Sequence, residues 1–557
     1  MAEEVQVTSP GGVSLPVVAL FLLTFALALP TADNSQAPGP RIPVVQDWTH
    51  RHVVFGGGGS LEARIAAARN PRAVQQWLIR QQAWLQAQKD GGNNGLHLGQ
   101  AKKQVDWAVS LGSTGGVSPT MYPAKYSFSV TTASCDDFMV FPVNAGGAGK
   151  ASIVILDSLY SGGSTATAGM CNTGNTTPGA NGPYNSGGTY EARVWAAYTL
   201  PNPVTTSPVL SLDGTKVLVV DTVCNLHQIT IPSDHSTTYG TVASPATPTK
   251  TSASLGGAAC TKSSPFVDYS TGAAYVGNDS GVLYKIPNAF GTPGTPTSGT
   301  VDSGHALLSP VVDSDLQRVL VTTTYGKLCL VNATNLTVVG SCAQPGAEGA
   351  VSVITDPPLV DSTNVRVYVF GNSEAGSPIP FVRQYKYSAI ALTPLRLFQN
   401  NTMAASFGIH VGAFDDPYYS DTPTNGYLYF AAPKTSSRTE LFKIAFDSPL
   451  ELKTSQNSSM WLCSTICETS PLTEFKSGTT ERIFYSVLST GTVGSATTGL
   501  ALTTAATTYP GGTSGIIVDN AVFPLQQASS ICFGTLGTGA CGTGNYCAVK
   551  LTQSGLQ

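Results

Sequence analysis

Residues 264–286 read SPFVDYSTGAAYVGNDSGVLYKI and contain the pattern that decides the fold. A Ser-Pro pair opens a short apolar run, and two further apolar runs follow, each after a turn that contains glycine. Short β-branched and aromatic runs between clusters of Gly, Ser, Asn and Asp are typical of antiparallel strands. The stretch therefore predicts three strands that follow one another in one sheet.

The same unit recurs along the chain. Successive prolines that open the units lie 57, 45, 48, 59 and 54 residues apart, and an earlier unit without the proline begins at Asp136. Repeated units of about 40–50 residues, none of which can bury both faces of its strands alone, indicate a β-propeller. The openings are Ser207-Pro208, Ser264-Pro265, Ser309-Pro310, Pro357-Pro358, Asp416-Pro417 and Ser470-Pro471.

We therefore predict an all-β fold in which residues 105–557 form a β-propeller of seven four-stranded blades. The seventh unit, from Pro471 onward, is long enough to hold insertions together with closing strands. A double β-sandwich or an open β-solenoid is the alternative. The strands expected to close the ring are Val105–Leu111, Tyr126–Thr131, Ile531–Thr535 and Cys547–Leu551.

Composition excludes several classes of protein. Only 11% of the 557 residues are charged, and 29 Lys and Arg face 33 Asp and Glu, which gives a net charge of −4. A disordered chain needs more charge and fewer apolar residues, and a nucleic-acid-binding protein needs a basic excess. The 58 glycines instead suit a globular protein with many tight turns.

The N-terminus predicts export. Val13–Leu29 is an uncharged apolar run, and Ala26-Leu27-Ala28 offers a signal-peptidase site. Residues 1–30 are therefore interpreted as a signal peptide or a retained membrane anchor, although Glu3 and Glu4 replace the basic flank that signal peptides usually have.

The eleven cysteines contain no Cys-x-x-Cys motif, which argues against a zinc ribbon and against a thioredoxin-like redox site. In an oxidising compartment, Cys463 with Cys467 and Cys541 with Cys547 are candidate disulfide pairs. The odd total leaves at least one thiol unpaired.

Between this terminus and the propeller, residues 31–59 are predicted to be an extended polar and glycine-rich linker, residues 60–90 an amphipathic helix and residues 91–104 a second linker. Ser60 is a suitable N-cap. The helix packs on the main domain or binds an interface or partner. Its apolar stripe consists of Val74, Trp77, Leu78, Trp84 and Leu85.

His50 and His52 lie two residues apart with no third metal ligand nearby in the sequence. Two such histidines are weak evidence for a metal site. A surface or packing role is the interpretation we favour.

Residues 274–285 (AYVGNDSGVLYK) resemble the repeat of pyrroloquinoline-quinone-type propellers, the quinoprotein-like superfamily, and residues 320–340 are similar. The resemblance implies a fold shared by quinoprotein dehydrogenases, by a scaffold lipoprotein of outer-membrane assembly and by many exported proteins. The chain departs from the dehydrogenases, since it has no adjacent Cys-Cys pair and lacks the tryptophan that closes many of their repeats. A non-catalytic member of this superfamily is therefore favoured.

Acidic residues recur three positions after the opening proline in Asp268, Asp313, Asp361 and Glu474. Such residues stabilise turns by accepting hydrogen bonds from their own backbone. The alternative is a ring of carboxylates at one mouth of the channel that binds a cation such as Ca²⁺.

His305 and His410 each precede a unit's first strand, which predicts that both face the same end of the channel. A paired role in proton transfer or metal binding would need a third group, and none has matching spacing.

These observations predict an exported, non-catalytic propeller that acts as a binding, scaffold or structural subunit in the periplasm, at the outer membrane or outside the cell. No catalytic residue and no cofactor are predicted. The expected partner is a protein or a polysaccharide at the cell surface, not a nucleic acid, with membrane association through residues 13–29 and with oligomers allowed. The alternatives are a divergent quinoprotein dehydrogenase, a propeller glycosidase or lyase, and a surface adhesin or filament subunit.

Overall fold

The computed structural model describes residues 42–57, 69–90, 104–130, 132–161, 171, 191–346, 352–374, 378–399, 407–435, 438–477, 480–503, 507–519 and 530–552. The expected signal or anchor at 1–30 lies outside the described residues. Among the described helices, none is long and apolar enough to cross a membrane.

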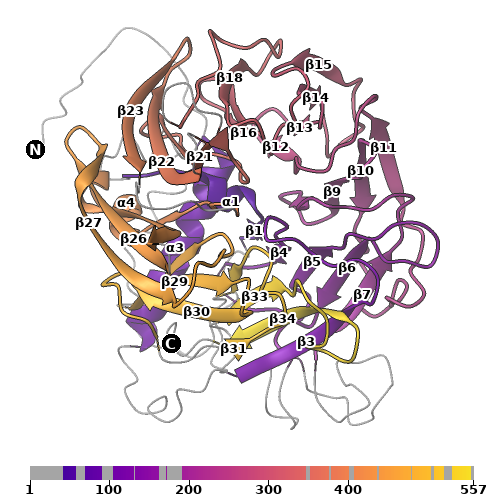
Figure 1. The fold of residues 1–557 in the computed structure, drawn as a ribbon. Coiled ribbons are helices and arrows are strands. Elements are labelled where there is room, and N and C mark those ends of the chain that lie inside the picture. The colour runs from indigo at the N-terminus through magenta and orange to yellow at the C-terminus, as the bar shows by residue number, and fades with distance from the viewer. Residues whose placement is uncertain are drawn as a thin grey trace, which may run out of the picture. The chain divides into compact units, whose positions relative to one another are not determined.

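Eight β-sheets follow one another around a central axis (Figure 1). In most of the sheets, antiparallel strands succeed one another outward from the axis in chain order, which is the arrangement of a β-propeller. We number the sheets as blades 1 to 8, in the order of their innermost strands. Apolar residues from the facing surfaces of adjacent blades form the core, as Tyr126 and Phe138 of blade 1 do with Val217 of blade 2.

The first four blades lie between residues 124 and 332. Blade 1 contains β4 (Ala124–Ser127), β5 (Phe138–Pro142), β6 (Ile153–Asp157) and β7 (Arg193–Tyr198). Blade 2 contains β8 (Val209–Leu210), β9 (Lys216–Val220), β10 (Asn225–Thr230) and β11 (Lys250–Ser254). Blade 3 contains β12 (Phe266–Asp268), β13 (Ala273–Gly277), β14 (Val282–Ile286) and β15 (Thr297–Thr300). Blade 4 contains β16 (Val311–Asp313), β17 (Arg318–Thr322) and β18 (Leu328–Asn332).

The other four blades complete the ring. Blade 5 contains β19 (Ser352–Val353), β20 (Leu359–Asp361), β21 (Arg366–Glu374), β22 (Pro378–Tyr387) and β23 (Leu392–Gln399). Blade 6 contains β24 (Ala413–Phe414), β25 (Tyr427–Thr435), β26 (Arg438–Asp447) and β27 (Glu451–Cys463). Blade 7 contains β28 (Thr473–Ser477), β29 (Thr480–Val487), β30 (Thr492–Thr497) and β31 (Thr507–Thr508). Blade 8 contains β32 (Ile517–Asp519), β33 (Ser530–Gly534), β34 (Tyr546–Thr552) and β3 (Gln104–Gly112).

The prediction of seven blades is wrong, because the unit that begins at Pro471 holds two blades. Blade 8 opens at Ser514-Gly515 without a proline, and only three of its strands come from this part of the chain. Its sequence therefore lacks the pattern that marks the other units. The unit at Asp416-Pro417 also differs from expectation, since these residues begin the short helix α4 (Asp416–Ser420), next to the 3₁₀ turn η4 (Pro423–Asn425).

The ring is closed by strands from both ends of the chain, as expected. β3 pairs antiparallel with β34, with Val109 opposite Ala548. A buried ion pair joins the first and last blades, because Lys125 Nζ lies 2.7 Å from Asp519 Oδ1. The closing strand expected at 126–131 is found only in part, because β4 of blade 1 ends at Ser127.

Residues 42–57, which fall in the linker expected at 31–59, form secondary structure inside the channel. β1 (Val44–Gln46) pairs antiparallel with β4, α1 (Thr49–His52) follows, and β2 (Val53–Val54) pairs parallel with β20. The helix α3 (Pro71–Asp90) contacts β1 and β28. Figure 1 shows α1 near the centre of the ring and α3 running from there toward the lower left. We call residues 42–57 and 71–90 together the plug segment.

The helix at 60–90 differs from expectation in the face that it buries. Residues 58–68, with the expected cap at Ser60, and the side chains of residues 81–90 lie outside the description. In the first turns of α3, Arg72, Ala73 and Gln75 are buried, whereas Trp77 of the apolar stripe is 52% exposed. Polar side chains point inward because the channel wall offers backbone groups and carboxylates that need partners.

Arginines of α3 connect the plug segment to two distant blades. Arg72 Nη2 donates to the Val267 carbonyl of blade 3 at 2.8 Å. Arg80 pairs with Glu474 of blade 7 at 2.7 Å and with Asp416 of α4 at 3.2 Å. The Glu474 side chain is only 2% exposed, so its charge depends on Arg80 for compensation.

We predict that Arg80→Met lowers the free energy of unfolding by about 2 kcal/mol, because it leaves a buried carboxylate without its partner. Urea unfolding measures this loss. Lys453→Met is the matched control, since Lys453 and Asp447 form an exposed pair at 3.5 Å whose removal costs less than about 1 kcal/mol. Equal losses in the two variants would contradict the proposed role of Arg80.

Candidate functional site

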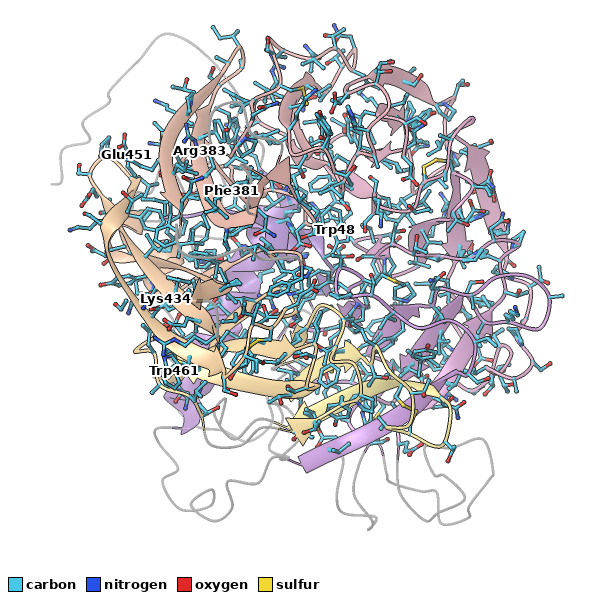
Figure 2. The ribbon with its side chains drawn as sticks, in the orientation of Figure 1. Trp48, Phe381, Arg383, Lys434, Glu451 and Trp461 are labelled. Atoms are coloured by element: carbon cyan, nitrogen blue, oxygen red, sulfur yellow. A yellow bond between two sulfur atoms is a disulfide. The ribbon has the colours of Figure 1, made fainter. Side chains whose placement is uncertain are left out.

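A cavity of about 500 Å³ lies at the end of the ring where the innermost strands begin. Trp48 and His52 of the plug segment contribute to its wall, and Figure 2 shows Trp48 near the centre of the ring. The other lining residues come mainly from the segments that lead into the innermost strands. These are 117–122, 205–206, 261–262, 308–309 and 353–357, with Asn144, Ser264, Thr324, His410 and Glu468.

The serines of the Ser-Pro repeat hold neighbouring blades together beside this cavity. Ser207 Oγ accepts the backbone N–H of Tyr122 at 2.9 Å, and Ser264 Oγ accepts that of Ser207 at 2.9 Å. Ser309 Oγ then accepts the N–H of Ser264 at 2.8 Å. Each serine thus satisfies a buried donor of the preceding blade, which gives the repeated dipeptide a structural cause.

An ionic cluster replaces these serine links between blades 5, 6 and 7. His410 Nδ1 lies 3.1 Å from both oxygens of Asp356, and His410 Nε2 lies 3.0 Å from Glu468 Oε1. Asp356 also accepts the backbone N–H of Val411 at 2.6 Å. One imidazole therefore joins two carboxylates from neighbouring blades.

The electrostatics make His410 an imidazolium. Burial disfavours the charged ring, but the adjacent Asp356 and Glu468 outweigh burial and raise the pKa of His410 to about 10. Burial acts against the Asp356 carboxylate too, yet the charge and hydrogen bonds of His410 lower the pKa of Asp356. The cluster is thus a cation between two anions at neutral pH.

Two further polar groups line the cavity. Burial lowers the pKa of His52 to about 4, so its ring is neutral near pH 7. Its Nδ1 lies 3.3 Å from the Pro358 carbonyl, which can only accept a hydrogen bond. Burial raises the pKa of Tyr122, and its hydroxyl is buried without a hydrogen-bond partner in the described part of the chain.

The repeated acids are not among the residues that line the cavity. Asp268, Asp313 and Asp361 end their innermost strands, and each accepts a backbone N–H from two residues later at 3.0 Å, which is the turn-stabilising arrangement. Burial is the leading cause that raises the pKa values of Asp313 and Asp361. Glu474 instead pairs with Arg80.

The structure separates the two predicted histidines. His410 lines the cavity, whereas His305 stacks on Tyr325 with a centroid distance of 4.1 Å and lies 3.1 Å from Asp302 Oδ2. Among the described residues, no three His, Cys, Asp or Glu side chains are grouped so as to hold a metal ion.

Five disulfides are present, and the two candidate pairs from the sequence are among them. Cys532 is a buried free cysteine. The disulfides are Cys135–Cys171, Cys224–Cys260, Cys329–Cys342, Cys463–Cys467 and Cys541–Cys547.

Sequence reasoning missed Asp356, Glu468 and Tyr122. A signal for two of them was present, because Asp356 immediately precedes the Pro357-Pro358 opening and Glu468 lies three residues before Pro471. The residues that open each unit lie at the end of the ring that holds the cavity. Charged residues just before these openings were therefore candidates for the cavity wall. Tyr122 follows no repeated pattern.

We predict that His410→Gln lowers the free energy of unfolding by about 3 kcal/mol near pH 6, because it removes the cation between two carboxylates. The folded-state pKa of about 10 lies above the unfolded value of about 6.5. The stabilisation is therefore complete below about pH 6.5 and is lost as the pH rises through 10.

Urea unfolding between pH 6 and 10 measures this difference. His305→Gln is the control, since the His305 side chain is 33% exposed. A deficit of His410→Gln that does not shrink at high pH would contradict the assignment.

No family model matches the chain, and no curated protein matches it. Solved structures that resemble it include three remote ones. Sqt1 of Saccharomyces cerevisiae is 8% identical with a TM-score of 0.48, over 80% of this chain and 99% of that one. The β-propeller domain of Cps50 (Swd1) from Myceliophteria thermophila is 9% identical with a TM-score of 0.37, over 81% and 99%. BamB from Moraxella catarrhalis is 12% identical with a TM-score of 0.35, over 70% and 95%. The propeller assignment therefore rests on the strand pairing of this chain.

Proposed function

We propose that the chain is an exported, non-catalytic β-propeller that binds a protein or polysaccharide partner through the cavity at the mouth of its channel. The observation that carries the proposal is the cavity itself. Its volume of about 500 Å³ falls within the range of roughly 300–1,000 Å³ typical of ligand sites. Seven of the eight blades and the plug segment contribute to its wall, so a ligand would contact residues from most of the ring.

The state of the cavity carboxylates supports binding over catalysis. Asp356 and Glu468 both face the His410 ring at 3.0–3.1 Å. General acid–base catalysis needs a group that gains and loses a proton near the working pH. The charge and hydrogen bonds of His410 lower the pKa of Asp356, so this carboxylate suits orientation of a ligand better than proton transfer.

Two observations support export and a place in the envelope or outside the cell. Disulfides persist in oxidising compartments, and this chain has five. The apolar run at 13–29 has the composition of a signal or anchor segment. We further propose membership of the quinoprotein-like superfamily, on the repeat pattern of residues 274–285 and 320–340.

We predict that a bulky side chain at the cavity wall abolishes binding. The test screens the full chain by thermal shift against neutral, acidic and amino oligosaccharides and against tripeptides. At least one compound should raise the melting temperature of the native protein, because a ligand that binds only the folded state stabilises it. Thr324→Trp, which fills the cavity, should remove that shift.

Thr393→Trp is the matched control, since Thr393 is exposed on β23 of blade 5. It should retain the shift of the native protein. Binding that survives in Thr324→Trp would overturn the cavity as the site, and a panel without any hit would overturn the proposed function.

We also predict that the protein purified from its native compartment contains one reactive thiol per chain after denaturation without reductant. Reduction should raise this number to eleven, because ten of the eleven cysteines form the five disulfides. Thiol titration in denaturant measures both values. Eleven thiols before reduction would contradict an oxidising compartment.

A further inference from the structure

We propose that Ser252 is an activated nucleophile and the acceptor of an acyl group from an activated ester or thioester. Ser252 lies on β11, the outermost strand of blade 2, and does not line the cavity. The inference therefore adds a covalent modification site to the binding role proposed above. Three side chains carry it: an exposed serine, a buried histidine that contacts its hydroxyl, and a buried aspartate behind the histidine.

Strand pairing in blade 2 places the serine beside the histidine. β10 and β11 are antiparallel, and His227 lies directly opposite Ser252. Directly opposed residues carry their side chains on the same face of a sheet, and here Ser252 Oγ lies 2.7 Å from His227 Nδ1. Ser252 is exposed, whereas His227 is buried. The contact therefore joins a residue that faces solvent to a ring inside the blade.

Asp221 holds the histidine from the other side. His227 Nε2 lies 3.1 Å from Asp221 Oδ2, and the Asp221 side chain is fully buried. Burial acts against this carboxylate, but hydrogen bonds from His227, Asn225 and Asn202 lower its pKa. Because an ionised carboxylate only accepts hydrogen bonds, Nε2 carries the proton that joins the pair. In a ring with one proton, Nδ1 is then free to accept from the Ser252 hydroxyl.

The turn that carries Asp221 is fixed by further contacts. Asp221 Oδ1 accepts the backbone N–H groups of Val223 and Asn225 at 3.1 and 2.8 Å. The disulfide Cys224–Cys260 links this turn to the segment that follows β11. The aspartate, and through it the imidazole, is therefore held in position before any reagent arrives.

Lys250 supplies a positive charge beside the nucleophile. Lys250 Nζ donates to Ser252 Oγ at 3.0 Å and lies 3.4 Å from His227 Nδ1. A cation at this distance favours the negative oxygen that forms as the serine hydroxyl loses its proton. Activated serines share this arrangement, in which a base lies within hydrogen-bond reach of the nucleophile and a third group orients the base.

The reaction moves one acyl group onto the serine. Ser252 Oγ bonds to the acyl carbon, His227 Nδ1 takes the hydroxyl proton, and the bond from the acyl carbon to the leaving oxygen or sulfur breaks. The leaving group departs with the bonding electrons and receives the proton from His227. Turnover of an unactivated ester would need a site that binds and orients it. A reactive donor needs only an exposed serine, so a single acylation is the expected result.

The test treats the full chain with p-nitrophenyl acetate, follows the release of p-nitrophenolate and maps the acetylated peptide by mass spectrometry. We expect a burst of one equivalent per chain and an acetyl group on Ser252. Ser252→Ala should abolish the burst. His227→Gln should slow it about 100-fold, which lies within the range of general-base contributions. Asp221→Asn should slow the burst of the folded protein too, because the imidazole loses the group that orients it.

Ser254→Ala is the matched control, because Ser254 is exposed on the same strand but lies opposite Asn225. It should react like the native chain. Circular dichroism checks that each variant is folded, and Ser252→Ala, which alters an exposed side chain, decides the outcome even if His227→Gln does not fold. A native-like burst in Ser252→Ala, or acetylation of Ser254 as fast as that of Ser252, would overturn the proposal. Steady turnover after the burst would overturn a single acylation and contradict the non-catalytic role.

Discussion

The innermost strand of each propeller blade presents unpaired backbone groups to the channel, and the rest of this structure depends on how those groups are satisfied. β1 and β2 of the plug segment pair with two of the eight innermost strands. Side chains serve others, since Trp48 donates to the Pro265 carbonyl at 3.1 Å, Arg72 to Val267 at 2.8 Å and Arg51 to Glu474 at 3.2 Å. The indole of Trp48 and the guanidinium groups of Arg51 and Arg72 thus share one task, which is to donate to carbonyls of the channel wall.

The contacts that connect neighbouring blades beside the cavity are of two chemical kinds. Blades 1 to 4 are connected by serine hydroxyls that accept single backbone donors, which are neutral links of modest strength. Blades 5 to 7 are connected by Asp356, His410 and Glu468, whose links are charged. Charge-assisted hydrogen bonds are about twice as strong as neutral ones. The ionic links also tolerate less change, because removal of His410 leaves the Asp356 carboxylate buried without its cation.

Much of the fold was predictable from local pattern. The short alternating runs predicted the strands and the propeller class. The sequence also predicted that β3 closes the ring, because 105–111 is an apolar run outside any repeated unit. The eighth blade was not predictable, since its strands come from opposite ends of the chain and its opening lacks proline. The buried face of α3 was not predicted. Amphipathicity predicts that Trp77 is buried rather than Arg72, but the channel wall needs side chains that donate hydrogen bonds. The Asp356–His410–Glu468 cluster joins residues 54 and 58 positions apart, a proximity that only the ring creates.

The plug segment also orders the assembly of the chain in time. It precedes every blade in the sequence, yet its contacts reach residues far downstream: Trp48 bonds a carbonyl 217 positions later and Arg51 one 423 positions later. Contacts of such separation form late, because the entropy of closing long loops must be met first. The plug segment is therefore synthesised before the blades but is fixed among them last. A circular permutation that moved the plug segment to the C-terminus would have to thread it into a finished ring.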